Sequence, residues 1–276
     1  MYSLELQKNK KATQMLKILS AITFIFTVSF GSSGFADDHQ SNAGASPSLM
    51  EGFECNLNKG VSLEEMIAFG RNEFASLMTS AGIELSTFVW EPLSIAPPYD
   101  ETDFRWFNYY PSWQAYQAAD TLWYSKGNAK NRAKLDKLAA CGTPIFNRVH
   151  GVVQTESSLD GTDHNGNRIL IGLCNVTKGM GFADVRGYIT PELSKNVREA
   201  AGADRGQFLM VPAMGINAEF DFLNTLYATP VEMAKLLDAG REGKLMAARA
   251  ATTNETPPYN CHTWHLHKSH RIIQGQ

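Results

Sequence analysis

The hexapeptide CNLNKG occupies residues 55–60, and the hexapeptide CNVTKG occupies residues 174–179. The two stretches carry a cysteine, an asparagine, a lysine and a glycine at the same four positions. Each follows a short apolar run, and a polar stretch that closes on glycine is typical of a turn that leads from a strand into a helix. The echo predicts that the chain contains the same structural unit twice.

The similarity extends well beyond the two hexapeptides. Residues 52–155 align with residues 171–276 at a nearly constant offset. The matched positions are Cys55 with Cys174, Phe88-Trp90-Pro92 with Phe208-Met210-Pro212, residues 104–108 with 220–224, Cys141 with Cys261, and His150 with His270. We interpret the chain as a tandem duplication, with one repeat at residues 51–157, a linker at 158–168 and a second repeat at 169–276.

Both repeats show the same order of predicted elements: strand, helix, strand, strand, helix, strand. The strands are short apolar runs with alternation, such as STFVWEP at 86–92 and FRWFNYY at 104–110. Four helix starts are indicated by a hydroxyl residue at the N-cap position, at Ser62, Ser112, Thr190 and Thr229. Glu65 and Glu232 complete predicted capping boxes, and prolines follow Thr190 and Thr229 at the first helical position.

This order of elements is that of a ferredoxin-like unit, whose sheet carries helices on one face only. The opposite apolar face must be covered, and a second copy of the unit can cover it. The element order and the internal repeat resemble the dimeric α/β-barrel superfamily, in particular members with two ferredoxin-like halves in one chain. The resemblance implies an α+β fold in which two tandem βαββαβ repeats pack sheet to sheet as an α/β barrel. The chain also resembles exported bacterial proteins with a cysteine in the first strand and another before the last.

The four cysteines allow three disulfide pairings. In a ferredoxin-like sheet the first and last strands are antiparallel neighbours, so a cysteine late in the first strand lies beside one at the beginning of the last. The repeat therefore predicts the disulfides Cys55–Cys141 and Cys174–Cys261. Redox or metal chemistry is the competing interpretation, but the sequence has no CxxC motif.

The N-terminal segment is predicted to be a signal peptide covering residues 1–36. Lysines precede an apolar run at 18–30, and small residues follow it. The run is shorter than the about 20 residues that a membrane span needs. Residues 37–50 are small and polar, which indicates a flexible linker. We therefore expect a periplasmic or secreted protein without a stable membrane span after cleavage; an uncleaved N-terminal anchor is the alternative.

The charge of the chain argues against nucleic acid as a partner. The net charge is −3 for the whole chain, and removal of residues 1–36 takes away four lysines and one glutamate, which makes the remainder more acidic. No run of lysine or arginine follows, so the electrostatic footprint of a nucleic-acid-binding protein is missing from the sequence.

The histidines cluster near the C-terminus, in CHTWHLHKSH at 261–270. On an extended strand His265 and His267 point to the same side and could bind one metal ion; a polar surface strand is the plainer interpretation. His150 and His270 are equivalent in the duplication, which makes them candidates for proton transfer. A repeated structural hydrogen bond would explain them equally well.

Aromatic residues concentrate in the first repeat, which predicts an asymmetric pocket between the sheets, centred on that repeat. The candidate lining residues are Trp90, Trp106, Asn108, Phe222 and Asn224. The alternative is that the same residues form a closed inter-sheet core.

The sequence therefore favours an exported protein that binds, or binds and transforms, a small apolar or aromatic molecule in an inter-sheet pocket. Activities of the resembling superfamily include cofactor-free oxygenation, haem-dependent chemistry, hydrolysis and isomerisation, but none of their motifs can be matched here residue by residue. The sequence therefore does not identify a cofactor, an oligomeric state or an enzyme activity. The alternatives are a non-catalytic, disulfide-stapled envelope interaction protein and a metal-binding protein that uses the C-terminal histidines.

Overall fold

The computed structural model describes residues 49–97, 101–153, 166–215 and 219–273. The predicted signal peptide and most of the predicted lead-in lie outside these residues. Leu49 and Met50, which the sequence analysis assigned to the lead-in, are the buried first residues of a strand. Within the described part of the chain, no helix is both long enough and apolar enough to span a membrane.

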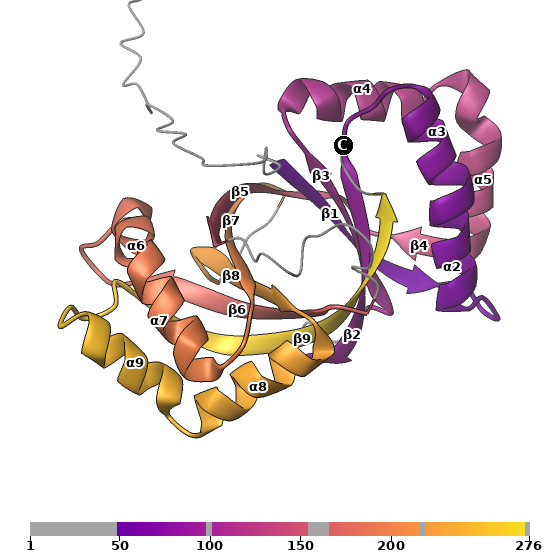
Figure 1. The fold of residues 1–276 in the computed structure, drawn as a ribbon. Helices are drawn as coiled ribbons and strands as arrows, with labels where there is room; N and C mark the ends of the chain where they lie inside the picture. Colours follow the sequence, from indigo (N-terminus) through magenta and orange to yellow (C-terminus); the bar gives the residue numbers. More distant parts are fainter. Residues whose placement is uncertain (1–48, 98–100, 154–165, 216–218, 274–276) are drawn as a thin grey trace, which may run out of the picture. The chain divides into compact units, whose positions relative to one another are not determined.

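The predicted order of elements is confirmed in both repeats (Figure 1). The first repeat consists of β1 (Leu49–Leu57), α2 (Leu63–Phe69), the π-helical turn η1 (Gly70–Phe74), α3 (Ala75–Ser80), β2 (Ser86–Ser94), β3 (Phe104–Tyr110), α4 (Trp113–Trp123), the 3₁₀ turn η2 (Lys126–Asn128), α5 (Ala129–Leu138), β4 (Ala139–Cys141) and β5 (Ile145–Val153). The second repeat consists of β6 (Arg168–Val176), α6 (Phe182–Tyr188), α7 (Pro191–Ala201), β7 (Gly206–Met214), β8 (Phe222–Ala228), α8 (Pro230–Arg241), α9 (Lys244–Thr252) and β9 (Tyr259–Ile273).

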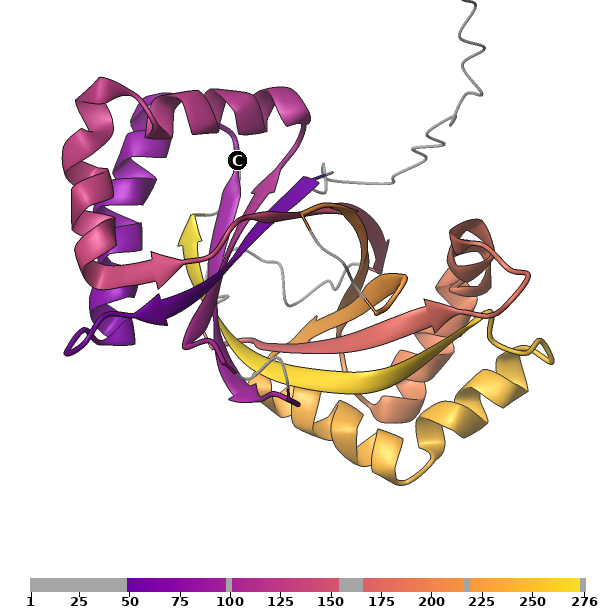
Figure 2. The same ribbon diagram turned by 180° about the vertical axis from the view of Figure 1, so that it is seen from behind.

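The two sheets join edge to edge into one closed sheet. The strands follow the order β3-β2-β9-β6-β8-β7-β5-β1, and β1 pairs with β3 to close the ring, while β4 adds to β1. The contacts between repeats are the antiparallel pairs β2–β9 and β5–β7. The faces without helices thereby become the inside of a barrel, and the helices of the two repeats cover opposite sides of it (Figures 1 and 2). The predicted α/β barrel is confirmed. The two sheets do not only pack against each other, as predicted, but also hydrogen-bond through β2–β9 and β5–β7.

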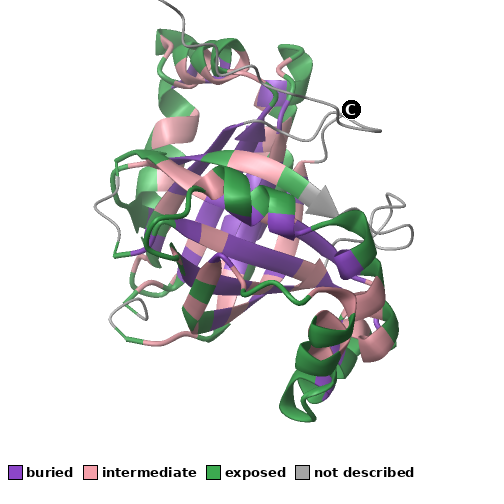
Figure 3. Ribbon diagram, turned by 90° about the vertical axis from the view of Figure 1, so that its left-hand side faces the viewer, coloured by how far each residue is buried: buried purple, intermediate pink, exposed green. Residues whose placement is uncertain are grey.

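Two kinds of core result from this closure, one inside the barrel and one under each set of helices. The inner core mixes residues of both repeats: Met50, Trp90, Phe107, Tyr109, Ile169, Ile171 and Met210. The core under the first repeat's helices includes Phe74, Phe104 and Trp106. Strands such as β1 and β3 therefore bury both of their faces. Figure 3 shows many buried residues along the strands and many exposed residues along the helices.

The local signals in the sequence hold at most helix starts. The Oγ of Ser62 accepts the N–H of Glu65, and the Glu65 carboxylate accepts the N–H of Ser62 over 2.8 Å, so the first capping box is confirmed. Thr229 caps α8 as predicted, but the Glu232 carboxylate accepts the N–H of Asp204 instead of completing a box. The chain thus uses that carboxylate to hold the loop before β7. In the turns after β1 and β6, the final glycines adopt the expected positive φ, 84° at Gly60 and 90° at Gly179.

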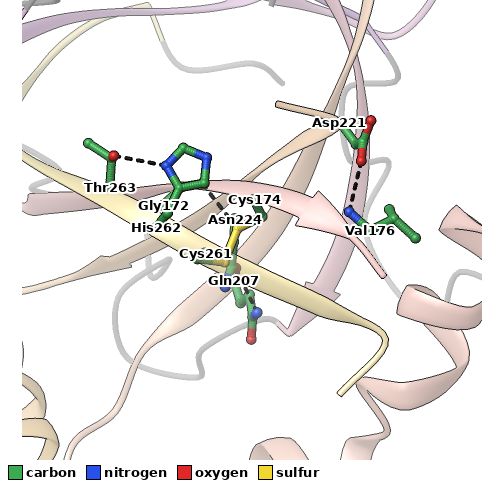
Figure 4. Close-up of a disulfide and its surroundings, with 9 residues drawn as sticks. All are labelled: Gly172, Cys174, Val176, Gln207, Asp221, Asn224, Cys261, His262 and Thr263. Carbon is green, nitrogen blue, oxygen red and sulfur yellow. Dashed lines mark hydrogen bonds between the residues drawn. A yellow bond between two sulfur atoms is a disulfide. The ribbon is translucent and has the colours of Figure 1, made fainter. Parts of the chain in front are cut away.

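Both predicted disulfides are present, Cys55–Cys141 and Cys174–Cys261. Each pair lies directly opposite in its ladder, on β1–β4 in the first repeat and on β6–β9 in the second. Figure 4 shows the second bridge between neighbouring strands. The cysteine of each hexapeptide therefore ties the first strand of its repeat to the chain that returns after the last helix.

The register of the duplication differs from the sequence alignment in one strand. The alignment matched residues 104–108 with 220–224, but Phe104 lies opposite Cys55 and Phe222 lies opposite Cys174. Phe222 is therefore the counterpart of Phe104. Asp103 and Asp221 support this, because each carboxylate accepts the backbone N–H at the end of the first strand of its repeat over 2.8 Å.

Candidate functional site

A cavity of about 460 Å³ lies in the first repeat, between the outer face of the sheet and the helices that cover it. It is walled mainly by aromatic side chains and methionines: Phe53, Met66, Phe69, Phe74, Met78, Trp106, Tyr110, Tyr116, Trp123 and Tyr124. Tyr124 is 66% exposed, so the cavity reaches the protein surface. Its volume falls within the range of about 300–1,000 Å³ that is usual for small-molecule pockets.

The π-helical turn η1 shapes one wall of this cavity. It interrupts the helical segment that begins with α2 and ends with α3, and it includes Phe74. The ring of Phe74 meets Trp106 edge to face, with centroids 5.2 Å apart and planes at 88°, and also contacts Trp123 at 5.6 Å. The absence of a side chain at Gly70 lets η1 pack closely on the Trp106 ring, because a Cβ at this position would lie only 2.9 Å from the ring. Turns of this kind often occur at functional sites.

The floor of the cavity is a buried hydrogen-bond network around Glu51, which is 6% exposed. Oε2 of Glu51 accepts hydrogen bonds from Nδ2 of Asn108 at 2.9 Å and from the hydroxyl of Tyr110 at 3.0 Å. Oδ1 of Asn108 in turn accepts from Thr87 and from the indole N–H of Trp106. Oε1 of Glu51 accepts no hydrogen bond from the residues that the structure describes. The network therefore fixes the carboxyl group and leaves one oxygen for the cavity.

Electrostatics favours a proton or a cation at this floor. Burial raises the pKa of Glu51; the hydrogen bonds from Asn108 and Tyr110 oppose the shift, and the nearby Asp120 adds to it. Asp120 and Asp136 also line the cavity, against the single cation Arg132 among the described lining residues. The lining is thus acidic, although its walls are apolar.

The second repeat contains a smaller cavity of about 180 Å³ under its own helices. Its polar residues form a chain in which Arg205 donates to Gln207 at 2.9 Å and Gln207 donates to Asn224 at 2.8 Å. Figure 4 shows Gln207 and Asn224 near the disulfide. Burial, followed by the neighbouring Arg198, lowers the pKa of Arg205 to about 10. The two repeats therefore place opposite charges beneath their helices.

The prediction that five residues line one inter-sheet pocket is wrong in its geometry. Trp106 and Asn108 line the larger cavity, and Asn224 lines the smaller one. Trp90 belongs to the inner core, and Phe222 packs against Phe182 under the helices of the second repeat. The cause is that strands such as β3 and β8 are buried on both faces, so alternation cannot tell which face points into the barrel. The larger of the two described cavities does lie in the first repeat, as expected.

His150 and His270 are equivalent in the barrel, since His150 lies opposite Leu209 and His270 lies opposite Val89. They do not meet, and neither lines a described cavity. Nε2 of His270 is 2.8 Å from the Glu91 carboxylate, whereas the ring of His150 packs against Phe182 at 5.1 Å. Their role in proton transfer stays a prediction.

His265 and His267 share the inner face of β9, as expected from alternation, and both are buried. Nε2 of His267 accepts from Arg105 at 2.9 Å, and Arg105 is held by Glu54 at 3.0 Å. Nδ1 of His265 accepts the N–H of Ala96. Burial lowers the pKa of His267 to about 3, with a further contribution from the Arg105 charge.

These contacts disfavour a metal ion at the two histidines. The guanidinium of Arg105 occupies Nε2 of His267 and would repel a cation there. Among the described residues, no group of three histidines, cysteines, aspartates or glutamates is arranged to hold a metal ion.

Glu51 is not among the site residues predicted from the sequence. A signal for it exists, because in LMEGFECNL Glu51 shares a strand face with Leu49, Phe53 and Cys55. A carboxylate on an otherwise apolar face is the feature that could have indicated a buried polar site.

No protein-family model and no curated protein matches the sequence. Several solved structures are similar to it at low identity, and three of them illustrate the match. A candidate chlorite dismutase has 14% identity and a TM-score of 0.48, over 82% of this chain and 96% of its own. A variant of the chlorite dismutase from Candidatus Nitrospira defluvii has 8% identity and a TM-score of 0.44, over 82% and 92%. A heme-binding protein from Thermus thermophilus has 11% identity and a TM-score of 0.45, over 81% and 91%.

The fold itself follows from the strand order. Two βαββαβ repeats pair through β2–β9 and β5–β7 into one closed sheet, with the helices outside. This is the fold of the dimeric α/β-barrel superfamily, with both halves in a single chain.

Proposed function

We propose that this is an exported protein that binds a small apolar or aromatic molecule in the cavity beneath the helices of the first repeat. The observation that carries the proposal is the cavity itself, which combines aromatic walls with a buried, hydrogen-bonded carboxyl group. Apolar walls with a few fixed polar groups are typical of small-molecule sites.

The size of the cavity supports binding over a purely structural core. Protein interiors are close-packed, and unfilled volume lowers stability in proportion to its size. A space of about 460 Å³ bordered mainly by apolar side chains is therefore a departure from close packing that a scaffold alone does not require. A ligand that fills this space would recover the lost contacts.

Export is supported by the leader-like segment in the sequence and by the two disulfides, which persist in oxidising compartments.

The cavity can be filled from within to test the proposal. Ala119 lies on α4, is buried and lines the cavity, so Ala119→Phe places a ring inside it. Ser194 lines the smaller cavity of the second repeat, so Ser194→Phe is the matched control. Binding of indole and naphthalene would be measured by calorimetry, and protein from the native host would be examined for copurifying ligands by native mass spectrometry.

We expect wild type and Ser194→Phe to bind alike, and Ala119→Phe to bind at least about tenfold more weakly. Leu135→Trp, on α5, offers a second way to fill the cavity if Ala119→Phe is unstable. Equal binding by wild type and both filled variants, or no binding and no copurifying ligand, would favour the stapled interaction scaffold instead.

A further inference from the structure

The carboxyl group at the floor of the cavity is not required by the fold, because the second repeat does without it. Glu51 and Asn108 are cross-strand partners on β1 and β3. Counted from the matched cysteines and from Phe104 and Phe222, the same positions in the second repeat hold Leu170 and Leu226, which are partners on β6 and β8. Leu170 and Leu226 pack into an apolar core under the second set of helices. A buried carboxyl group is unfavourable unless something compensates for it, so its presence in one repeat alone points to a function.

The carboxyl group is held in one orientation. Both of its hydrogen bonds end on Oε2, from Asn108 and Tyr110. Oε1 is left as an acceptor for a donor in the cavity. Because an ionised carboxylate only accepts hydrogen bonds, the complementary ligand group is a donor.

The walls add a preference for positive charge. The cavity lining includes the rings of Trp106, Tyr116 and Trp123, and aromatic faces attract cations, most strongly when water is excluded. Asp120, at the same cavity, adds negative charge near Glu51.

The one described cation of the lining is engaged elsewhere. Arg132 donates to the backbone carbonyl groups of Trp123 and Ser125, and its guanidinium lies 5.8 Å from the ring centre of Tyr124. It therefore helps to order the end of α4 at the rim, and Glu51 is left without a cationic partner among the described residues.

From these contacts we infer that the ligand is an organic cation: an amine or ammonium group attached to an apolar or aromatic body. The positive nitrogen lies against Oε1 of Glu51 and the aromatic walls, and the body fills the rest of the cavity. This inference rests on the proposed function and names the ligand class for the same site.

Binding of such a cation is coupled to ionisation of Glu51. Burial raises the pKa of Glu51, and a bound ammonium group favours the ionised form. At a pH below the raised pKa, binding therefore releases a proton, and affinity increases as the pH rises through it. The other titratable or charged groups of the described cavity lining are Tyr110, Tyr116, Tyr124, Asp120, Arg132 and Asp136.

The test compares three probes of similar size: phenethylamine, phenethyl alcohol and hydrocinnamate, which are cationic, neutral and anionic. Calorimetry in buffers with different ionisation enthalpies gives both the affinity and the number of protons released. The variants are Glu51→Gln and, as matched control, Glu54→Gln, which removes the same charge from the opposite face of the same strand.

We expect wild type and Glu54→Gln to bind phenethylamine about tenfold more tightly than phenethyl alcohol, and hydrocinnamate least tightly. Glu51→Gln should bind the amine and the alcohol within about twofold of each other and release no proton. Asp120→Asn, on the half-exposed face of α4, should reduce the amine preference in part and provides a second variant if Glu51→Gln does not fold.

If phenethyl alcohol binds wild type as tightly as the amine, or if Glu51→Gln keeps the full preference, the inference is overturned. The proposed function still stands in that case, provided that Ala119→Phe abolishes binding of the alcohol. If none of the three probes and neither of the uncharged aromatics binds to wild type, both the proposed function and the inference fail.

Discussion

Nδ2 of Asn108 donates to Oε2 of Glu51 over 2.9 Å, beneath the helices of the first repeat. Asn108 also accepts from Thr87 and Trp106, so one amide satisfies three buried partners. Asn108→Leu leaves these groups without a partner, and we expect it to lower the free energy of unfolding by about 1–3 kcal/mol. Urea unfolding measures the loss. Asn224→Leu is the control, because the side-chain oxygen of Asn224 accepts from Gln207 alone among the described residues, and this variant should lose less.

The coupling between the two side chains can be measured by a double-mutant cycle. Glu51→Leu combined with Asn108→Leu should destabilise less than the sum of the single variants, by about 0.5–3 kcal/mol. Strict additivity would mean that the hydrogen bond at the cavity floor contributes nothing to stability.

Stability should depend on pH through Glu51. Below pH 4.5, the ordinary value, both the folded and the unfolded chain hold the proton and the carboxyl group has no effect. As the pH rises toward the raised pKa of the folded state, the unfolded chain gains by ionising while the buried group does not, so stability is lost. Above the raised pKa the loss stays constant.

Glu51→Gln removes the ionisable group and therefore its pH-dependent effect on stability. The amide oxygen of the glutamine can still accept hydrogen bonds from Asn108 and Tyr110. The urea midpoint of Glu51→Gln relative to wild type should therefore rise as the pH increases from 4.5 through the raised pKa of Glu51. A difference that stays flat over this interval would show that the pKa of Glu51 is not raised.

His267 should remain neutral where an ordinary histidine titrates. Its pKa is lowered to about 3 by burial and by Arg105. As the pH falls from about 6.5, the unfolded chain takes up a proton that the folded chain does not, so stability falls toward acid and is fully present above that value. NMR titration should show unchanged ring signals of His267 from about pH 8 to about pH 5. Arg105→Gln should raise the pKa of His267 but leave most of the effect of burial; a mid-range titration in wild type would contradict the assignment.

The two disulfides should be separable in their effects. Each closes a long loop, with partners 86 and 87 residues apart, and paired replacement by serine should cost roughly 3–5 kcal/mol in either repeat. Only the first bridge touches the larger cavity, through Cys141. Replacing Cys55 and Cys141 should therefore also weaken ligand binding, whereas replacing Cys174 and Cys261 should not. Alkylation of unreduced wild type followed by intact mass analysis should detect no free thiol.

Much of the fold could be predicted because the same pattern of strands and helices occurs in both repeats of the chain. Cys55 with Cys141 and Cys174 with Cys261 are confirmed because the repeat reduced three pairings to one, and the sheet topology made the chosen partners neighbours. Ser62 is confirmed as an N-cap because a capping box is a local interaction that needs no tertiary information.

The site was harder to predict, because it depends on which buried face of a strand points into the barrel and which points toward the helices. Trp106 and Asn108 alternate with Phe107 and Tyr109, and all four are buried. Alternation separates the two pairs but cannot assign either one to the inside of the barrel. The match of Asn108 with Asn224 was misleading because identical residues were aligned in place of the equivalent positions, and that error hid the contrast between Asn108 and Leu226.

The two inter-repeat seams, β2 with β9 and β5 with β7, have a consequence for the chain as an assembly of two parts. A half released by cleavage between the repeats would present two unpaired outer strands and an uncovered apolar surface, which are the features that promote aggregation. Each half therefore protects the other from aggregation, because it pairs with the outer strands of the other half and covers its apolar surface. With the fold maintained by both repeats, the first repeat is free to change its residues for ligand binding while the second repeat retains an apolar core.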